Sequence, residues 1–177
     1  MSLIESALGI FVPEAEALVK PFRDRYDPSA AAGVPAHITL LHPFKPPDEI
    51  NEGVLDNLRR CIAGFAPFEF SLASIRRFPD AIYLAPEPDE PFRQLTLAIW
   101  KRYPEAPPYG GKWSDIIPHL SVAAQLTDEQ QLRRIADDFA QACQGQLPIH
   151  ATVSQILLVD NSSGHWLTRT TFSLGRE

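Results

Sequence analysis

Two short stretches of the sequence organise the interpretation of the whole chain: AHITLL at residues 36–41 and PHLSVA at residues 118–123. Each places a histidine and a hydroxyl residue two positions apart, inside an apolar run short enough to be a strand. On a strand, residues i and i+2 point to the same face, so we expect His37 beside Thr39 and His119 beside Ser121. Two such strands brought together would supply two imidazoles and two hydroxyls to one site.

The segments around the two histidine stretches are predicted to follow one order: strand, helix, loop, histidine strand, helix, strand. In the first half we expect a strand at 7–12, a helix from Pro13, a helix capped by Asp48 and ending near Gly64, and strands at 68–75 and 81–85. In the second half we expect a helix at 92–103, a helix opened by a capping box at Thr127, and strands at 148–159 and 165–174.

The first helix is expected to bury Ala17, Leu18 and Phe22, because these apolar residues are spaced for one helix face. Pro21 lies inside the same segment. Proline lacks the backbone donor and clashes with the preceding turn, so it is predicted to kink or split this helix.

Equivalent residues recur at a constant offset along the chain. His37 and His119 are 82 residues apart (119 − 37), and so are Cys61 and Cys143 (143 − 61). The halves share little sequence identity, so the repeat is one of layout, and two similar lobes would bring equivalent strands face to face. We therefore expect a single domain over residues 1–177 with two lobes, about 1–85 and 86–177, divided at the proline-rich segment 86–91.

The overall composition is that of an ordinary globular chain, with 177 residues, 45% hydrophobic and 21% charged. A net charge of −6 argues against a long nucleic-acid groove, since tracking phosphates requires clustered lysine and arginine. No basic leader followed by an apolar run and no run of about 20 apolar residues is present, so we expect a cytoplasmic protein without a membrane segment, acting as a monomer. Two cysteines make neither a disulfide framework nor a zinc motif.

With the motifs His37-Ile38-Thr39 and His119-Leu120-Ser121 in matched positions, the sequence resembles the two-histidine phosphoesterase superfamily, and more closely its 2′-5′ RNA ligase-like branch. The likeness in layout covers nearly the whole chain. It implies an α+β fold of two pseudo-symmetric lobes, with two antiparallel sheets flanking a central cleft and helices on the outside. It also implies a site without metal or cofactor, in which the two histidines, Thr39 and Ser121 act on 2′,3′-cyclic phosphates or 2′-5′ phosphodiesters.

The chemistry of the residues agrees with that resemblance. Hydrolysis of a cyclic phosphodiester needs a base for water and an acid for the departing ribose oxygen, and histidine serves in either role near neutral pH. Hydroxyl groups can donate to the nonbridging oxygens that carry charge in the transition state. The same site run in reverse would join a cyclic phosphate to a 5′-hydroxyl.

Other histidines compete with the two motifs. His150-Ala151-Thr152 fits the same pattern, but the position 82 residues earlier is Phe68, so His150 has no symmetric partner and is interpreted as part of a polar strand face. His42 has the opposite strand parity to His37 and is expected at a strand end or rim, and His165 beside a turn. No carboxylate lies within either motif to support a metal, and no Gly-x-Ser-x-Gly elbow supports a serine triad.

Outside the motifs, the loop Tyr109-Gly110-Gly111-Lys112-Trp113 is the best candidate for substrate contact. Tyr109 and Trp113 could stack on a base and Lys112 could approach a phosphate, while a purely structural loop with Trp113 in the core is equally compatible with the sequence. Arg76 and Arg77 follow a predicted strand and are left outside the catalytic set.

Three functions remain open from the sequence. The leading one is a metal-independent phosphodiesterase whose substrate is a small cyclic nucleotide or a short RNA end, with 2′-5′ RNA ligation as its reverse reaction. The second is a nucleotide- or RNA-end-binding module on the same fold without catalysis, and the third is a structural domain with chance motifs. Two intact His/hydroxyl pairs favour the enzyme. The sequence does not distinguish the acid histidine from the base.

Overall fold

The computed structural model, which describes residues 3–175, shows the predicted alternation of side chains between the two faces of the histidine strands. Ile38 and Leu120 are fully buried, whereas His37 and His119 on the neighbouring positions are only partly buried. The apolar side chains of both strands thus enter a core, and the polar ones point to the opposite face.

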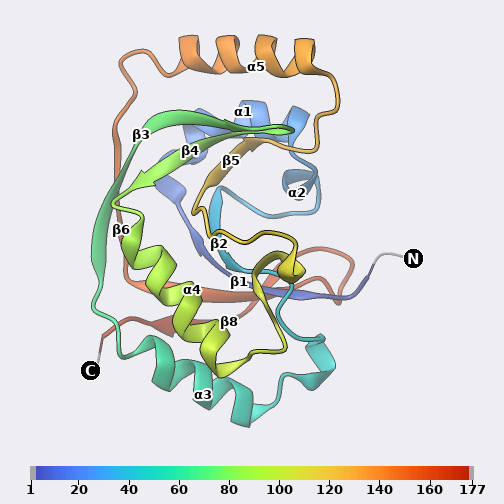
Figure 1. The fold of residues 1–177 in the computed structure, drawn as a ribbon, viewed down its shortest axis with the longest axis vertical. Helices are drawn as coiled ribbons and strands as arrows, with labels where there is room; N and C mark the ends of the chain where they lie inside the picture. Colours follow the sequence, from blue (N-terminus) through green and yellow to red (C-terminus); the bar gives the residue numbers. More distant parts are fainter. Residues whose placement is uncertain (1–2, 176–177) are drawn as a thin grey trace.

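The strands form one continuous antiparallel sheet with the order β6-β3-β4-β5-β2-β1-β7-β8 (Figure 1). The strands are β1 (Ser6–Phe11), β2 (His37–Leu41), β3 (Phe68–Phe78), β4 (Ala81–Glu87), β5 (Leu120–Ala123), β6 (Ile149–Val153), β7 (Gln155–Asp160) and β8 (Leu167–Ser173). The α+β class is confirmed, but the prediction of two separate sheets is wrong. β2 and β5, which were expected to face each other across a cleft, instead pair with each other. This pairing satisfies their backbone N–H and C=O groups and joins the two predicted sheets into one.

The helices pack at two ends of this curled sheet. The helices α1, α2 and α5 lie at one end of the molecule, and α3 and α4 lie toward the other (Figure 1). Their bounds are α1 (Pro13–Tyr26), α2 (Pro28–Ala31), α3 (Glu52–Ile62), α4 (Glu90–Arg102) and α5 (Glu129–Ala142), with short 3-10 helices η1 (Pro47–Glu49) and η2 (Pro108–Gly111). No helix of residues 3–175 is both long enough and apolar enough to cross a bilayer.

The structure corrects the prediction for the first helix. Helix α1 runs unbroken through Pro21, and its buried residues are Ala15, Val19 and Arg23 rather than Ala17, which is exposed. Pro21 removes the hydrogen bond to the carbonyl of Ala17, and on the exposed face water can take the place of that donor. An arginine therefore occupies the third position of the buried stripe.

Two other helices begin later than predicted, because a different side chain provides the cap. Asn51 rather than Asp48 caps α3, its side chain accepting from the backbone N–H of Val54 at 3.1 Å. Asp128 rather than Thr127 caps α5, accepting from the N–H of Gln130 at 2.9 Å. Each capping oxygen satisfies a donor of the first helical turn, as the predicted residues would have done.

The predicted strand at 148–159 is divided into β6 and β7, which meet at Ser154. β6 lies at the edge next to β3, whereas β7 lies beside β1 in the other half of the sheet. The chain therefore crosses between the halves at this residue. The division into lobes 1–85 and 86–177 stays a prediction; in the sheet, β3 and β4 lie beside β5 and β6.

Candidate active site

The two histidine motifs lie side by side at the centre of the sheet. β2 and β5 are antiparallel neighbours, and Ile38 pairs with Leu120. An antiparallel register extended from this pair places His37 opposite Ser121 and Thr39 opposite His119. All four side chains occupy the face opposite Ile38 and Leu120, so the predicted catalytic residues are brought together by two adjacent strands rather than by two opposing sheets.

The pairings of the two motif strands with their outer neighbours are irregular at equivalent places, with Leu40 of β2 and Val122 of β5 left without a register partner there. The β1–β2 register shifts between Leu8 and Gly9, and the β4–β5 register shifts between Ile82 and Tyr83. A bulge bends a strand and redirects its side chains. Beyond the shifts, Gly9 pairs with Thr39 and Tyr83 pairs with Ser121.

Both imidazoles make the same hydrogen bond. Nδ1 of His37 donates to the carbonyl oxygen of Pro35 at 2.8 Å, and Nδ1 of His119 donates to that of Ile117 at 2.7 Å. A carbonyl oxygen only accepts, so Nδ1 carries the hydrogen in each ring. Nε2 is therefore the atom left for chemistry in both, as an acceptor in the neutral ring and as a donor in the charged ring.

The surroundings favour the neutral form of both rings in the free protein. Burial lowers the pKa of His37 from 6.5 to about 4, and the positive charge of Arg23 acts in the same direction. Burial also lowers the pKa of His119. A proton on His119 further lowers the pKa of His37, so the two rings are close enough to influence each other.

Aromatic side chains surround His119. Its ring centroid lies 5.1 Å from that of Phe78, 5.5 Å from that of Tyr83 and 6.2 Å from that of Tyr109. Phe78 and Tyr83 also stack on each other at 4.4 Å. The sequence did not connect Phe78 and Tyr83 with His119, because this proximity arises from the pairing of β4 with β5, which are far apart in the chain.

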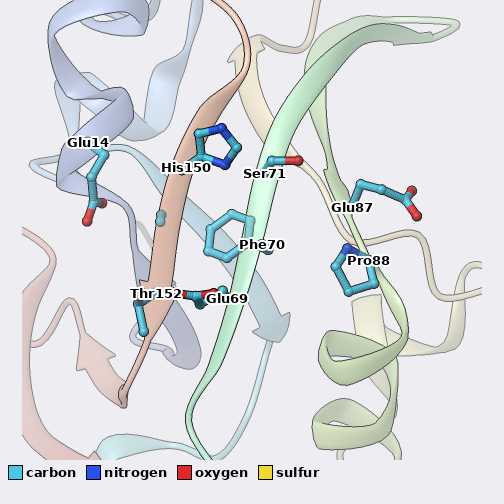
Figure 2. A pocket seen from close by; sticks show the side chains of 9 residues that line it. Glu14, Glu69, Phe70, Ser71, Glu87, Pro88, His150 and Thr152 are labelled. Carbon is cyan, nitrogen blue, oxygen red and sulfur yellow. The ribbon is translucent and has the colours of Figure 1, made fainter.

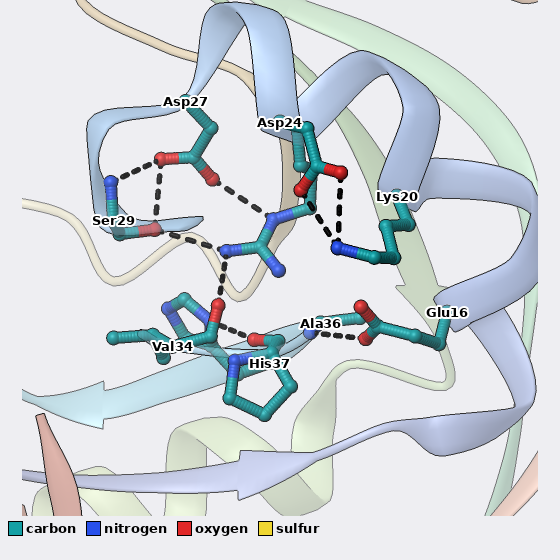
Figure 3. A network of polar contacts seen from close by, with 10 residues as sticks. Glu16, Lys20, Asp24, Asp27, Ser29, Val34, Ala36 and His37 are labelled. Atoms are coloured by element: carbon teal, nitrogen blue, oxygen red, sulfur yellow. Dashed lines mark hydrogen bonds and ion pairs between the residues drawn. The ribbon is translucent and has the colours of Figure 1, made fainter. Parts of the chain in front are cut away.

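The segment that precedes His37 is attached to helix α1, as Figure 3 shows. Arg23 donates from Nη2 to the carbonyl of Val34 at 2.9 Å, and Glu16 accepts from the N–H of Ala36 at 2.6 Å. Arg23 is 1% exposed and pairs with the buried Asp27, with 2.9 Å between Nε and Oδ2. These contacts were not predicted. The available signal was that Arg23 follows Ala15 and Val19 at a spacing of four residues, which places all three on the same face of a helix.

The loop predicted to contact substrate places its three residues differently. Tyr109 stacks near His119 and has a left-handed backbone, with φ of 54°. Burial raises the pKa of its phenol to about 12. Lys112 and Trp113 are exposed, Trp113 to 70%, so the alternative of Trp113 in the core is wrong.

A cavity of about 370 Å³ lies next to the second motif, lined by Pro118, which precedes His119, and by the register partner of Ser121. Its lining includes Tyr83, Ile117 and Pro118, and also Arg76 of β3, the register partner of Tyr83. Arg76 is exposed. The lining also contains Arg93, which pairs with the lining carboxylates of Asp89 and Asp115, and it contains Glu87. Arg76 lies about two strand spacings from Ser121, roughly 10 Å.

Comparison with known proteins identifies the family. The model of the 2′-5′ RNA ligase superfamily matches residues 11–165. The chain belongs to the 2′-5′ RNA ligase superfamily. A relative from Bacillus pumilus (strain SAFR-032), described as "Putative phosphoesterase", is 27% identical over 164 residues, covering 90% of this chain and 91% of the relative. Another of that description, from Geobacillus kaustophilus (strain HTA426), is 27% identical and covers 94% of each chain.

Solved structures show the same fold. E. coli LigT, in its complex with 3′-AMP, is similar with a TM-score of 0.64 and 12% identity, covering 98% of this chain and 99% of LigT. LigT has also been solved with NADP+ and with ATP. The likeness to LigT establishes a LigT-like fold for this member of the 2′-5′ RNA ligase superfamily.

The other histidines of this superfamily member lie away from the motif pair. His150 is on β6, three strand positions from β5 or about 14 Å, and lines a cavity of about 470 Å³ with Glu14, Glu69 and Thr152 (Figure 2). His42 follows β2 and contacts Glu5, with 3.2 Å between Nε2 and Oε2. His165 is exposed.

Among residues 3–175, no cluster of three or more histidine, cysteine, aspartate or glutamate side chains is arranged to hold a metal ion. Cys61 and Cys143 are both buried free thiols, at the end of α3 and the C-cap of α5. Both lie near the C-terminal end of a helix, Cys61 inside α3 and Cys143 one residue beyond α5.

Proposed function

We propose that this protein is a metal-independent phosphodiesterase that acts on 2′,3′-cyclic phosphate or 2′-5′ phosphodiester bonds of small nucleotides or RNA ends. The observation that carries the proposal is the pair of matched hydrogen bonds from Nδ1 to a backbone carbonyl. They leave Nε2 of both His37 and His119 available beside Thr39 and Ser121. The phosphoesterase descriptions of the relatives and the nucleotide complexes of LigT support the same class of activity.

In the proposed hydrolysis, one Nε2 takes a proton from water as the water oxygen bonds to phosphorus. The bond from phosphorus to one ribose oxygen breaks, and that oxygen receives the proton carried by the other Nε2. The product is a phosphomonoester beside a free hydroxyl. Thr39 and Ser121 donate to the nonbridging oxygens, whose charge grows in the transition state.

The different surroundings of the rings assign their roles within this proposal. A second positive charge beside Arg23 is unfavourable, so His37 is the base that enters the reaction neutral. His119 is the acid, since aromatic rings attract a cation and the bound phosphate monoanion favours its protonated form. In the reverse direction, the ligation of a cyclic phosphate to a 5′-hydroxyl, the same base would activate that hydroxyl.

We place the base of the nucleotide near Tyr109 and Trp113, and assign Lys112 and Arg76 to further phosphate groups. Tyr109 lies next to His119, and Trp113 presents an exposed ring on the same loop. Stacking on an aromatic ring tolerates any base, which suits an enzyme for more than one RNA end.

A hydrolysis screen without metal tests the proposal. Purified protein is incubated in EDTA with each 2′,3′-cyclic mononucleotide and with 2′-5′- and 3′-5′-linked dinucleotides, and products are separated by chromatography. We expect turnover of the cyclic or 2′-5′-linked compounds that is lost in His37→Ala and in His119→Ala. His150→Ala is the matched control and should retain turnover; binding without turnover of any of these compounds would favour the non-catalytic module.

A further inference from the structure

Arg23 and Asp27, at the end of α1, form an ion pair that is buried, whereas ion pairs at this spacing of four residues usually lie on the surface. A charged pair inside a protein is retained where hydrogen bonds satisfy it, because burying charge is costly. Here Asp27 also accepts from the N–H of Ser29 at 2.9 Å and from its hydroxyl at 2.7 Å, and Arg23 donates to the same hydroxyl at 3.0 Å. Apolar residues of similar volume can often replace a buried ion pair without loss of stability, so the polar contacts of this pair point to a role beyond filling the core.

One of the polar contacts of Arg23 reaches the backbone just before His37, where Glu16 makes a second contact (Figure 3). Nη2 of Arg23 holds the carbonyl of Val34, and Glu16 holds the N–H of Ala36. The carbonyl of Ala36 accepts in turn from the N–H of Val12 at 2.9 Å. Pro35 lies between these restrained residues, and its carbonyl is the group that accepts from Nδ1 of His37.

The direction of the His37 ring thus depends on a carbonyl whose two neighbours are fixed to helix α1. A shift of Val34 would rotate the Pro35 carbonyl and move Nε2 with it. Misplacing a reacting group by about 1 Å can reduce turnover roughly 10²-fold. The arginine is also a fixed positive charge near the ring, balanced by Asp27.

The charged and titratable groups that act on His37 come from three places in the fold. Arg23 of α1 and His119, which directly precedes β5, disfavour a proton on the ring, whereas Asp27, which follows α1, favours one. Glu16 of α1 binds the adjacent N–H of Ala36. Removing Arg23 and removing Asp27 should therefore move the titration of His37 in opposite directions.

We infer that Arg23 is a positioning residue for the proposed base: its buried guanidinium, held by Asp27, fixes Val34 and thereby aims Nε2 of His37 at the substrate. Arg23 touches no reacting atom. The inference rests on the proposed function for its kinetic part, while the orientation and protonation of His37 are properties of the free protein.

The test combines NMR titration of the histidine rings with kinetics on the cyclic nucleotide identified in the screen. In Arg23→Gln we expect the pKa of His37 to rise, and in Asp27→Asn we expect it to fall. The pKa of His119 should stay at its wild-type value in both. Turnover in Arg23→Gln should fall about 10- to 100-fold with KM within about twofold of wild type, and Arg23→Lys should recover part of it.

Lys20→Gln is the matched control, because it removes the exposed Lys20–Asp24 pair from the same helix without touching residues 34–36. It should leave both titrations and turnover unchanged. If Arg23→Gln does not fold, Arg23→Lys and Asp27→Asn carry the same test. A His37 titration that is identical in these variants, or that shifts the same way in Arg23→Gln and Asp27→Asn, overturns the inference. Because the titration needs no substrate, a protein that hydrolyses none of the nucleotides defeats the proposed function and leaves Arg23 still testable.

Discussion

Residues 34–39 and 116–121 contain the same motif and the same hydrogen bond from histidine to the carbonyl two residues earlier, but they are held by different means. The first segment is fixed to α1 by a buried arginine and a glutamate. In the part of the chain that the structure describes, the second segment has an ion pair nearby, between Arg93 and Asp115. The side chain of Asp115 is 67% exposed. The second histidine is packed among aromatic rings instead.

The flanking strands extend this difference. Thr39 lies beside Gly9, which has no side chain, and Ser121 lies beside Tyr83. A Cβ at position 9 would meet the carbonyl of Ile38 at 3.2 Å, so the close packing of β1 on β2 favours glycine there. The two motifs thus have unlike surroundings, as expected if one histidine is the base and the other the acid in the proposed reaction.

The largest expected effect is the loss of either ring. His37→Ala and His119→Ala should each lower kcat by roughly 10²- to 10⁴-fold, the usual contribution of a positioned acid or base. The double variant should be little slower than the slower single variant, since the two groups act as a unit. Steady-state kinetics with His42→Ala and His150→Ala as controls measures this; equal damage from His150→Ala in a folded protein would show that the second motif is misassigned.

The hydroxyls should matter less than the rings. Thr39→Ala and Ser121→Ala each remove one donor to a charged oxygen, which corresponds to about 1.5–3 kcal/mol, or a loss of about 10- to 100-fold in kcat/KM. Thr39→Ser and Ser121→Thr keep the hydroxyl and should retain most activity. If the alanine variants behave like wild type, the hydroxyls do not contact the phosphate.

Tyr109 and Trp113 are the aromatic residues proposed to stack on the nucleotide base. Replacing either by leucine should raise KM by about 10-fold with a smaller change in kcat, because base stacking contributes about 1–3 kcal/mol. Trp100→Leu, which alters a partly exposed ring on α4, is a control for general destabilisation. An unchanged KM would place the nucleotide base elsewhere.

The pH dependence should reveal the two unlike rings. Because His37 has a pKa of about 4 in the free protein, kcat/KM should fall only as the pH drops toward 4, where the base becomes protonated. Because the pKa of His119 is lowered, kcat/KM should also fall as the pH rises, at a pH below the ordinary histidine value of 6.5. The bound phosphate stabilises the protonated acid, so the alkaline limb of kcat should lie at higher pH than that of kcat/KM. Titration of both rings by NMR identifies which limb belongs to which.

The smallest expected effect is that of a chelator. Both proton-transfer groups and both oxyanion donors of the proposed mechanism are side chains, so EDTA should leave kcat and KM unchanged. The measurement is turnover before and after chelation, with Mg²⁺ and Mn²⁺ added back. Activity that disappears with EDTA and returns with either ion would contradict the proposed mechanism.

The motif strands and most elements could be predicted because their information is local. A period of two residues at His37-Ile38-Thr39 and the 82-residue offset depend on the chain alone. The role of Arg23 could not be predicted from the sequence, since an arginine four residues before an aspartate on a helix usually forms a surface ion pair. The single sheet could not be predicted either, because pairing of β2 with β5 depends on residues far apart in the sequence. For the same reason Phe78 and Tyr83 were not connected with His119.

The crossing of the chain at Ser154 has a consequence for how the protein can fold and be divided. Strands β3 and β4 come from the first stretch of the chain but complete the sheet half of β5 and β6, while β7 and β8 return to complete the half of β1 and β2. Each half therefore borrows strands from the other, and both need contacts between distant residues before either is whole. A protease cut within residues 86–91 would release two fragments that each lack half of their own sheet, so the molecule should unfold as one cooperative unit.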